Sequence, residues 1–228
     1  MKQISLNLNN SLNYQAGFFY SHAGVKEILE AVLAGYQQEI FSRFFITGSS
    51  RSGKTHLAFK LADLALQLGK FAKVISGDNF SDWINTQYEK IEADNNTVII
   101  VDDLDCYFKT GSSGEFVSFY ETLRLCKAKL VLLSNCSINT MNVDNHIASR
   151  LQSGGALEIF KPEDHDLKGL LRLMARQRGI ELSQRSIEYL EKRIGRTIQD
   201  IEAHLNRLLA HSQHLSQPIK FAMLSDIL

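Results

Sequence analysis

The segment GSSRSGKT, Gly48 to Thr55, has the residue types and the spacing of a phosphate-binding loop. It fits the pattern G-x-x-x-x-G-K-T and stands between an apolar segment, RFFITG, and an amphipathic one, KTHLAFKLADLALQLG. Glycines let the backbone curl so that successive N–H groups face phosphate oxygens, and the amino end of the following helix adds a positive dipole. In this pattern Lys54 neutralises the β- and γ-phosphates, and the Thr55 hydroxyl joins the coordination shell of Mg²⁺. We therefore expect ADP or ATP to be bound by Gly48, Ser49, Ser50, Arg51, Ser52, Gly53, Lys54 and Thr55.

Polar residues also follow two other apolar segments. VIIVDD ends in Asp102 and Asp103, and LVLLSN ends in Ser134 and Asn135. Open α/β sheets bind ligands at the carboxyl ends of their strands. We expect Asp102 to bind Mg²⁺ together with Thr55, Asp103 to orient the attacking water, and Asn135 to hydrogen-bond the γ-phosphate or that water. Two simpler interpretations stay open: Asp103 as a cap of the next segment, and Asn135 as a turn residue.

Short apolar segments alternate with amphipathic ones between Ile40 and Lys161. This alternation is typical of an α/β domain with a parallel sheet covered by helices on both faces. The expected strands are 43–48, 72–76, 97–103, 129–135 and 156–160, and the expected helices are 54–69, 81–93, 115–128 and 143–151.

The pattern changes after Pro162, where the strand signals end. Helices are expected at 163–179, 183–195, 197–213 and 219–228. Thr197 and Asp200 have the spacing of a capping box, and Gly179 and Gly195 stand where helices should stop. We therefore expect an α/β domain over 11–161 and a small all-helical domain over 162–228, preceded by a flexible peptide over 1–10.

The bulk composition narrows the class of protein. Lys plus Arg and Asp plus Glu number 25 each, so the formal charge is zero and sequence-specific DNA binding is not expected. The three cysteines lack CxxC spacing, which is typical of reduced thiols in a cytoplasmic protein. No signal peptide is expected at MKQISLNLNN, and runs such as VIIV are too short to span a membrane.

The order of these motifs resembles that of AAA+ ATPases of the DnaA initiator group. GKTHL, VIIVDDLD, LLSN and IASRL are similar to the corresponding blocks of that family, from about Phe18 to the end of the chain. The resemblance implies an AAA+ P-loop domain followed by a helical lid. DnaA initiators also have a DNA-reading helix-turn-helix domain and a longer insertion before the VIIVDD strand. Without these two features, the chain is similar to the Hda group, the regulatory inactivators of DnaA.

The start of the chain, QISLNL, is similar to the peptide with which the Hda group binds the DNA polymerase III β sliding clamp. That peptide has the form Gln-Leu-x-Leu-x-Leu, and the matching residues here are Gln3, Ile4, Ser5, Leu6 and Leu8. An extended peptide can place Leu6 and Leu8 in apolar clefts while the Gln3 amide enters a polar pocket. The resemblance therefore implies two partners, the clamp and DnaA. A frayed amphipathic tail is the simpler alternative.

NHIASRL carries Arg150, which matches the arginine finger of the family. The resemblance implies that Arg150 acts in trans, on the γ-phosphate of ATP held by DnaA. A planar guanidinium of fixed charge stabilises the charge that develops during phosphoryl transfer. The simpler interpretation is a surface arginine paired with a nearby carboxylate such as Asp144.

One departure from the family bears on catalysis. The stretch IQDIEAHLNR has Gln199 where DnaA lids have a sensor arginine, and Arg196 lies one turn earlier. We expect weak or no intrinsic ATPase activity, with the nucleotide acting as a clasp, and the segment Phe18 to Ala23 covering the base. The alternatives are a self-sufficient ATPase such as a DnaC-like helicase loader and a nucleic-acid binder that forms homo-oligomeric filaments on single-stranded DNA.

Overall fold

The computed structural model describes residues 19–88, 92–217 and 219–226. The contacts divide the chain into two compact units. The first contains residues 23–161, and the second contains residues 162–228 together with 19–22 of the described chain.

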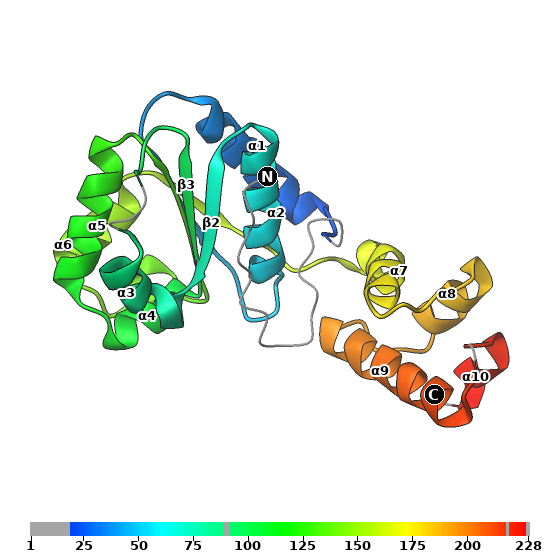
Figure 1. Ribbon diagram of the computed structural model, residues 1–228. Helices are drawn as coiled ribbons and strands as arrows, with labels where there is room; N and C mark the ends of the chain where they lie inside the picture. The colour runs from blue at the N-terminus through cyan, green and yellow to red at the C-terminus, as the bar shows by residue number, and fades with distance from the viewer. Residues whose placement is uncertain (1–18, 89–91, 218, 227–228) are drawn as a thin grey trace. The chain divides into compact units, whose positions relative to one another are not determined.

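The first unit alternates strands and helices along the chain (Figure 1). Its strands are β1 (Ser42–Thr47), β2 (Phe71–Ser76), β3 (Thr97–Asp102), β4 (Lys129–Ser134) and β5 (Gly155–Glu158). Its helices are α1 (Ala23–Gln37), α2 (Lys54–Gln67), α3 (Gly77–Thr86), α4 (Leu104–Thr110), α5 (Ser113–Leu125) and α6 (Asn145–Gln152), with a short 3₁₀ turn, η3 (Ile138–Thr140).

The five strands form one parallel sheet in the order β2-β3-β4-β1-β5. The expected five-stranded parallel sheet is therefore confirmed. The register pairs Thr47 with Ser134, Val101 with Leu132, and Ser76 with Asp102. These pairings bring the carboxyl ends of β1, β3 and β4 together at one end of the sheet, where the phosphate-binding loop begins.

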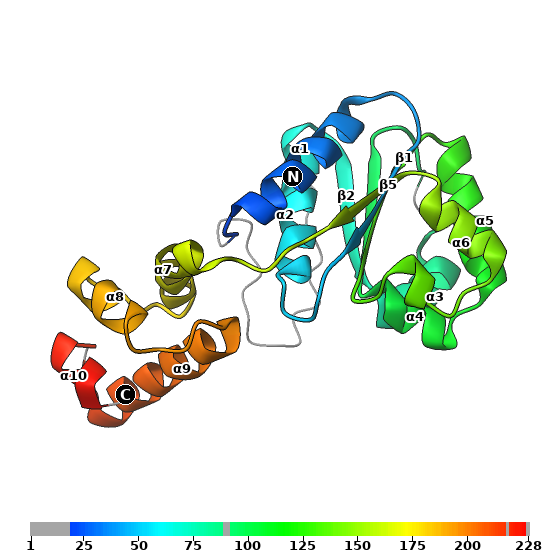
Figure 2. The ribbon, with the colours of Figure 1, turned by 180° about the vertical axis from the view of Figure 1, so that it is seen from behind.

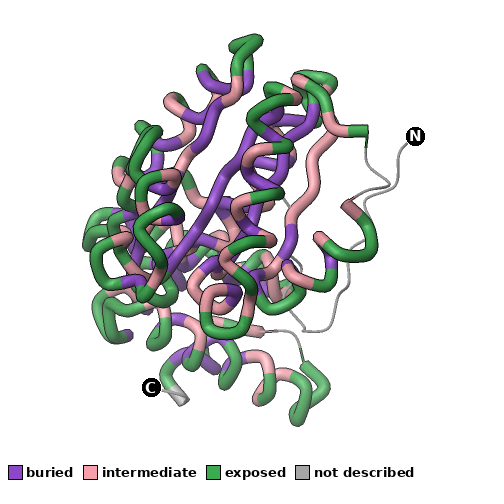
Figure 3. The backbone as a smooth tube through the Cα atoms, turned by 90° about the vertical axis from the view of Figure 1, so that its left-hand side faces the viewer, coloured by how far each residue is buried: buried purple, intermediate pink, exposed green. Residues whose placement is uncertain are grey.

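Helices cover both faces of this sheet. Figures 1 and 2 show α1 and α2 on one side and α3 to α6 on the other. Every residue of β3 and β4 is buried, as expected for central strands without a solvent face (Figure 3). The face under α3 to α6 carries the aromatic core, in which the rings of Phe80, Trp83, Tyr107, Phe116 and Phe119 pack edge to face, stacked or tilted.

The helix expected at 81–93 differs from the helix that forms. α3 starts directly after β2, with Ser76 at its N-cap and Asp78 in its first turn, where a carboxylate favours the helix dipole. It ends at Thr86, because Tyr88 turns inward and packs against Phe119 with ring centroids 5.0 Å apart.

The second unit is helical, with η4 (Asp164–Asp166), α7 (Leu167–Gln177), α8 (Gln184–Glu191), α9 (Ile198–Leu215) and α10 (Phe221–Asp226). Its own apolar core includes Leu171, Ile187, Leu190, Ile201 and Leu205, all fully buried. The capping box expected at Thr197 and Asp200 starts α9, and Gly179 follows α7 with a left-handed φ of 69°.

Among the described residues, no helix combines the length and the apolar character needed to cross a lipid bilayer.

Candidate functional site

The loop between β1 and α2 has a backbone shape that only particular residues allow. A Cβ at Gly48 would lie 2.1 Å from the Ile159 side chain, so the position has no room for a larger residue. Gly53, the N-cap of α2, has a left-handed φ of 97°, which glycine adopts without strain. The first turn of α2 contains no acidic residue and receives no side-chain cap. Its N–H groups therefore favour an anion such as a phosphate.

Lys54 begins α2 and turns its amine back over this loop. It is 5% exposed, and its Nζ donates to the carbonyls of Gly48 (2.9 Å) and Ser49 (3.0 Å) and to Asn135 Oδ1 (2.8 Å). Burial lowers the pKa of Lys54, and the carboxylates of Asp103 and Asp102 oppose that shift. The amine is therefore held within the loop by acceptors that a phosphate oxygen can replace.

Asp102 ends β3 beside the loop and is almost completely buried. Burial raises its pKa to about 6, and a hydrogen bond from Thr55 opposes the rise. Within the described part of the chain, its Oδ1 and the buried Ser52 Oγ have no hydrogen-bond partner. Buried polar atoms normally have partners, and Mg²⁺ binds carboxylate and hydroxyl oxygens. These atoms therefore fit a magnesium–nucleotide complex.

Asn135, at the end of β4, lies between Lys54 and two carboxylates. Its Nδ2 donates to Asp103 Oδ1 (3.0 Å), and its backbone N–H donates to Asp105 Oδ1 (2.9 Å). Asp103 precedes α4 with a left-handed φ of 52° and makes no side-chain cap bond there. No side-chain hydrogen bond therefore supports the simpler interpretation of Asp103 as a helix cap. Asn135 accepts a hydrogen bond from Lys54 and donates one to Asp103. Both predicted polar residues therefore lie beside the phosphate-binding loop.

Asp105, which was not among the residues predicted from the sequence, holds the carboxyl end of β4. It accepts hydrogen bonds from Ser134 Oγ (3.1 Å) and from Asn135. Burial alone would raise the pKa of Asp105, but the bonds from Asn135 and Ser134 outweigh it and lower the pKa. Its signal was the third acid of VDDLD, which follows a strand end by only a few residues.

Other loop residues lie at the surface. Ser49, Ser50 and Arg51 are exposed, whereas Gly48, Ser52 and Lys54 are buried. The loop therefore has a buried side formed by Lys54 and Ser52 and an open side toward solvent.

Arg150 lies near the carboxyl end of α6, at the end of the sheet where β1 starts. The buried Arg43 of β1 donates to the carbonyl of Leu151, which fixes that end of α6 beside the start of β1. Arg43 and Gly48 are five residues apart in an extended strand, about 16 Å at about 3.3 Å per residue. Arg150 is thus far from the phosphate-binding loop of its own chain.

The guanidinium of Arg150 is paired on the surface with Glu121 of α5, and not with Asp144. Arg150 Nη2 lies 2.8 Å from Glu121 Oε1, and the Arg150 side chain is 25% exposed. It is therefore neither fully buried nor directed at the loop of its own chain. Glu121 was not among the predicted residues, because a partner 29 positions away leaves no local sequence signal.

The lid residues that the resemblance singled out lie in the second unit. Gln199 is exposed on the first turn of α9. Arg196 forms an ion pair with Asp164, also in the second unit. Tyr20, from the segment expected to cover the base, donates to Asp166 Oδ1 at 3.1 Å.

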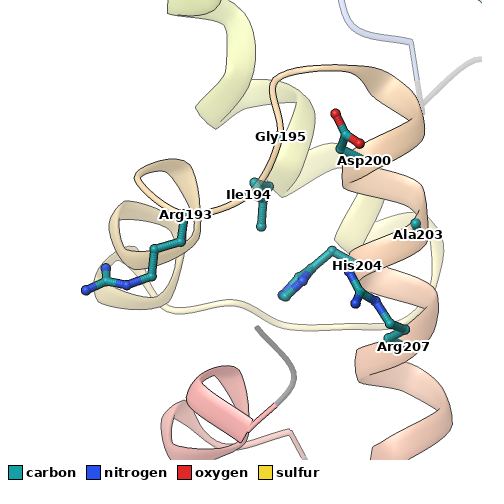
Figure 4. A pocket seen from close by; sticks show the side chains of 7 residues that line it. All are labelled: Arg193, Ile194, Gly195, Asp200, Ala203, His204 and Arg207. Atoms are coloured by element: carbon teal, nitrogen blue, oxygen red, sulfur yellow. The ribbon is translucent and has the colours of Figure 1, made fainter.

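A small pocket of roughly 140 Å³ lies in the second unit between α8 and α9 (Figure 4). His204 points into it, and its buried Nε2 has no partner in the described chain. Burial, and then Arg207, lower the pKa of His204. Nucleotide-sized ligands need pockets of about 300–1,000 Å³, so this pocket fits water or a small ion at most.

The predicted clamp-binding residues Gln3, Ile4, Ser5, Leu6 and Leu8 lie outside the described residues.

No family model matches the chain. It is similar to the chromosomal replication initiator protein DnaA of Roseiflexus castenholzii, with 25% identity over 211 residues. That match covers 86% of this chain and 44% of the relative, so the chain spans less than half the length of the curated relative.

Two solved structures are similar to most of the chain. Domain III of Thermotoga maritima DnaA superposes with a TM-score of 0.72 at 18% identity, covering 96% of this chain and 98% of that one. AMPPCP-bound DnaA from Aquifex aeolicus has a TM-score of 0.65 at 21% identity, covering 86% and 65%. The chain therefore has the AAA+ fold and is related to the AAA+ domain of DnaA.

Proposed function

We propose that this chain, a DnaA-related AAA+ protein, stimulates the hydrolysis of ATP held by DnaA and so restrains replication initiation. The observation that carries the proposal is the place of Arg150. It is partly exposed on α6, about a strand length from the phosphate-binding loop of its own chain. A guanidinium so placed can complete the catalytic site of a neighbouring subunit more readily than its own.

The chain's own loop is proposed to bind ADP or ATP with Mg²⁺. Lys54, Thr55 and Asp102 would hold the phosphates and the metal, and the bound metal would supply charge neutralisation at the phosphates. The related DnaA of Aquifex aeolicus binds AMPPCP, which supports a nucleotide here. With Gln199 in place of a lid arginine, the proposed role of this nucleotide is structural.

The amino-terminal peptide is proposed to tether the chain to the DNA polymerase III β sliding clamp through Gln3, Leu6 and Leu8. An extended peptide binds with modest affinity because its ordering costs entropy. The proposed test is a clamp pull-down with the double variant Gln3→Ala, Leu6→Ala. Retention equal to that of the unaltered chain would refute the tether.

The decisive measurement is phosphate release from ATP–DnaA in the presence of clamp-loaded DNA, with and without this chain. We expect release to accelerate only when all three proteins are present. An unchanged rate would refute the proposed function.

A second candidate is a stand-alone ATPase such as a DnaC-like helicase loader. The hydrogen bonds that join Lys54, Asn135 and Asp103 favour it, because they place a possible water-orienting carboxylate beside the loop. Steady ATP turnover by the purified chain alone, without clamp or DnaA, would favour this candidate over the first.

A further inference from the structure

Arg150 uses most of its hydrogen-bonding capacity on contacts within its own unit. Its Nε donates to Glu121 Oε1 at 2.9 Å, and its Nη1 donates to the carbonyl of His146 at 3.0 Å. Its Nη2 also lies 2.8 Å from Glu121 Oε1. A guanidinium has five N–H donors, so these contacts leave one N–H on each terminal nitrogen. Two terminal N–H groups are the donors with which arginine binds a phosphate in bidentate fashion.

Glu121 is itself held by a second arginine on the same helix. Arg124 Nε donates to Glu121 Oε2 at 2.8 Å. The bond from Arg150, with help from Arg124, lowers the pKa of Glu121, so its carboxylate is charged at neutral pH. The trio keeps one net positive charge, so Glu121 does not cancel the attraction of Arg150 for a phosphate.

The backbone beneath Arg150 is also fixed. Arg43 holds the Leu151 carbonyl, and the hydroxyls of Tyr120 and Ser153 lie 3.3 Å apart, within hydrogen-bonding distance. The Tyr120 ring lies 5.8 Å from the Arg150 guanidinium carbon, within the range of a cation–π contact. With the backbone fixed, the freedom that remains is that of the Arg150 side-chain torsions, which Glu121 restricts.

We propose that Glu121 is a positioning residue for Arg150. It holds the guanidinium in one orientation and directs the remaining terminal N–H groups toward the phosphate of a nucleotide bound by the neighbouring subunit. This inference rests on the proposed function of Arg150. The guanidinium is thus oriented before the partner binds. The stimulated rate of ATP hydrolysis therefore depends on Glu121 more than the affinity for the partner does.

The contact itself is tested without any partner. The full chain and its Glu121→Ala, Glu121→Gln and Glu115→Ala variants are treated with phenylglyoxal, and modification of Arg150 is followed by peptide mass mapping. Glu115 is the matched control, because it lies on α5 but accepts bonds from Ser81 and Asn85 instead of an arginine. We expect Arg150 to react about threefold faster in Glu121→Ala, as loss of a surface ion pair predicts, and at an unchanged rate in Glu115→Ala. Equal rates in all four proteins would overturn the inference.

The consequence is tested with ATP–DnaA and clamp-loaded DNA. Glu121→Ala should lower the maximal stimulated rate about tenfold, while the concentration of chain needed for half-stimulation changes less than about twofold. Glu121→Gln, which keeps an acceptor, should recover most of the rate. A maximal rate that stays the same or rises in Glu121→Ala would overturn the positioning role.

The two experiments separate the two proposals. If the unaltered chain fails to stimulate DnaA, the proposed function fails, and the phenylglyoxal rates still decide whether Glu121 holds Arg150. If the chain stimulates DnaA but phenylglyoxal modifies Arg150 at the same rate with and without Glu121, only the positioning role fails.

Discussion

Replacing Arg150 by alanine should separate catalysis in trans from stability. In GTPases an arginine supplied across an interface is worth about 10³–10⁵ in rate. At about 1.36 kcal/mol per tenfold, that range corresponds to roughly 4–7 kcal/mol of transition-state stabilisation. We therefore expect Arg150→Ala to lower DnaA-bound ATP hydrolysis to near its unstimulated rate.

The same substitution should change folding stability little. The ion pair with Glu121 joins side chains that are 25% and 31% exposed, and such surface pairs contribute about 0.2–1 kcal/mol. A loss of about 1 kcal/mol corresponds to a melting temperature about 2–4 °C lower for a chain of this size. Thermal unfolding followed by circular dichroism measures this change in melting temperature.

Arg124→Ala is the matched control, because Arg124 binds the same carboxylate but is 59% exposed. It should keep the stimulated rate to within about threefold. Stimulation of DnaA by Arg150→Ala to within about tenfold of the unaltered chain would refute the role of Arg150 in trans. A melting temperature about 10 °C lower or more for Arg150→Ala would also refute that role, since the arginine would then be chiefly structural.

Three further outcomes follow from buried groups. Burial raises the pKa of Asp102 to about 6, and Asp102 must be ionised to bind Mg²⁺. The affinity for a fluorescent nucleotide with Mg²⁺ should therefore fall as the pH drops through 6. An affinity that is constant between pH 5 and 8 would contradict this prediction. His204 has a pKa lowered by burial, so the unfolded chain binds more protons and the free energy of unfolding should decline as pH drops below about 6.5. Denaturant titrations across that range measure the decline, and His204→Gln should flatten it. At Gly77 an added Cβ would lie 2.1 Å from the Asp103 carbonyl oxygen, so Gly77→Ala should lower the free energy of unfolding by about 1–3 kcal/mol. Gly114→Ala, whose nearest contact would be Ser112 Oγ at 3.7 Å, should change it little, and equal effects of the two would count against the argument.

Several features that position the site left weak signals in the sequence. α1 was not predicted, although its buried residues Val25, Ile28, Val32 and Tyr36 follow helical spacing. α4 was not predicted either, because it starts directly after the strand-end acids and is only seven residues long. The expected helix over 81–93 was too long, since tertiary packing of Tyr88 overrides the local helical pattern.

The sequence alone determined the features that depend on neighbours along the chain. The phosphate-binding loop needs Gly48, Gly53 and Lys54 at fixed spacing, and the apolar runs fix the strands, so local chemistry specifies both. Only the tertiary structure decided which strand ends meet, that Asp105 holds Asn135, and that α6 ends at the sheet edge opposite the loop. Those facts depend on hydrogen bonds and ion pairs between residues far apart in the chain, such as Arg43 with Leu151 and Glu121 with Arg150. Such pairings form when strands and helices pack, and no local pattern encodes them.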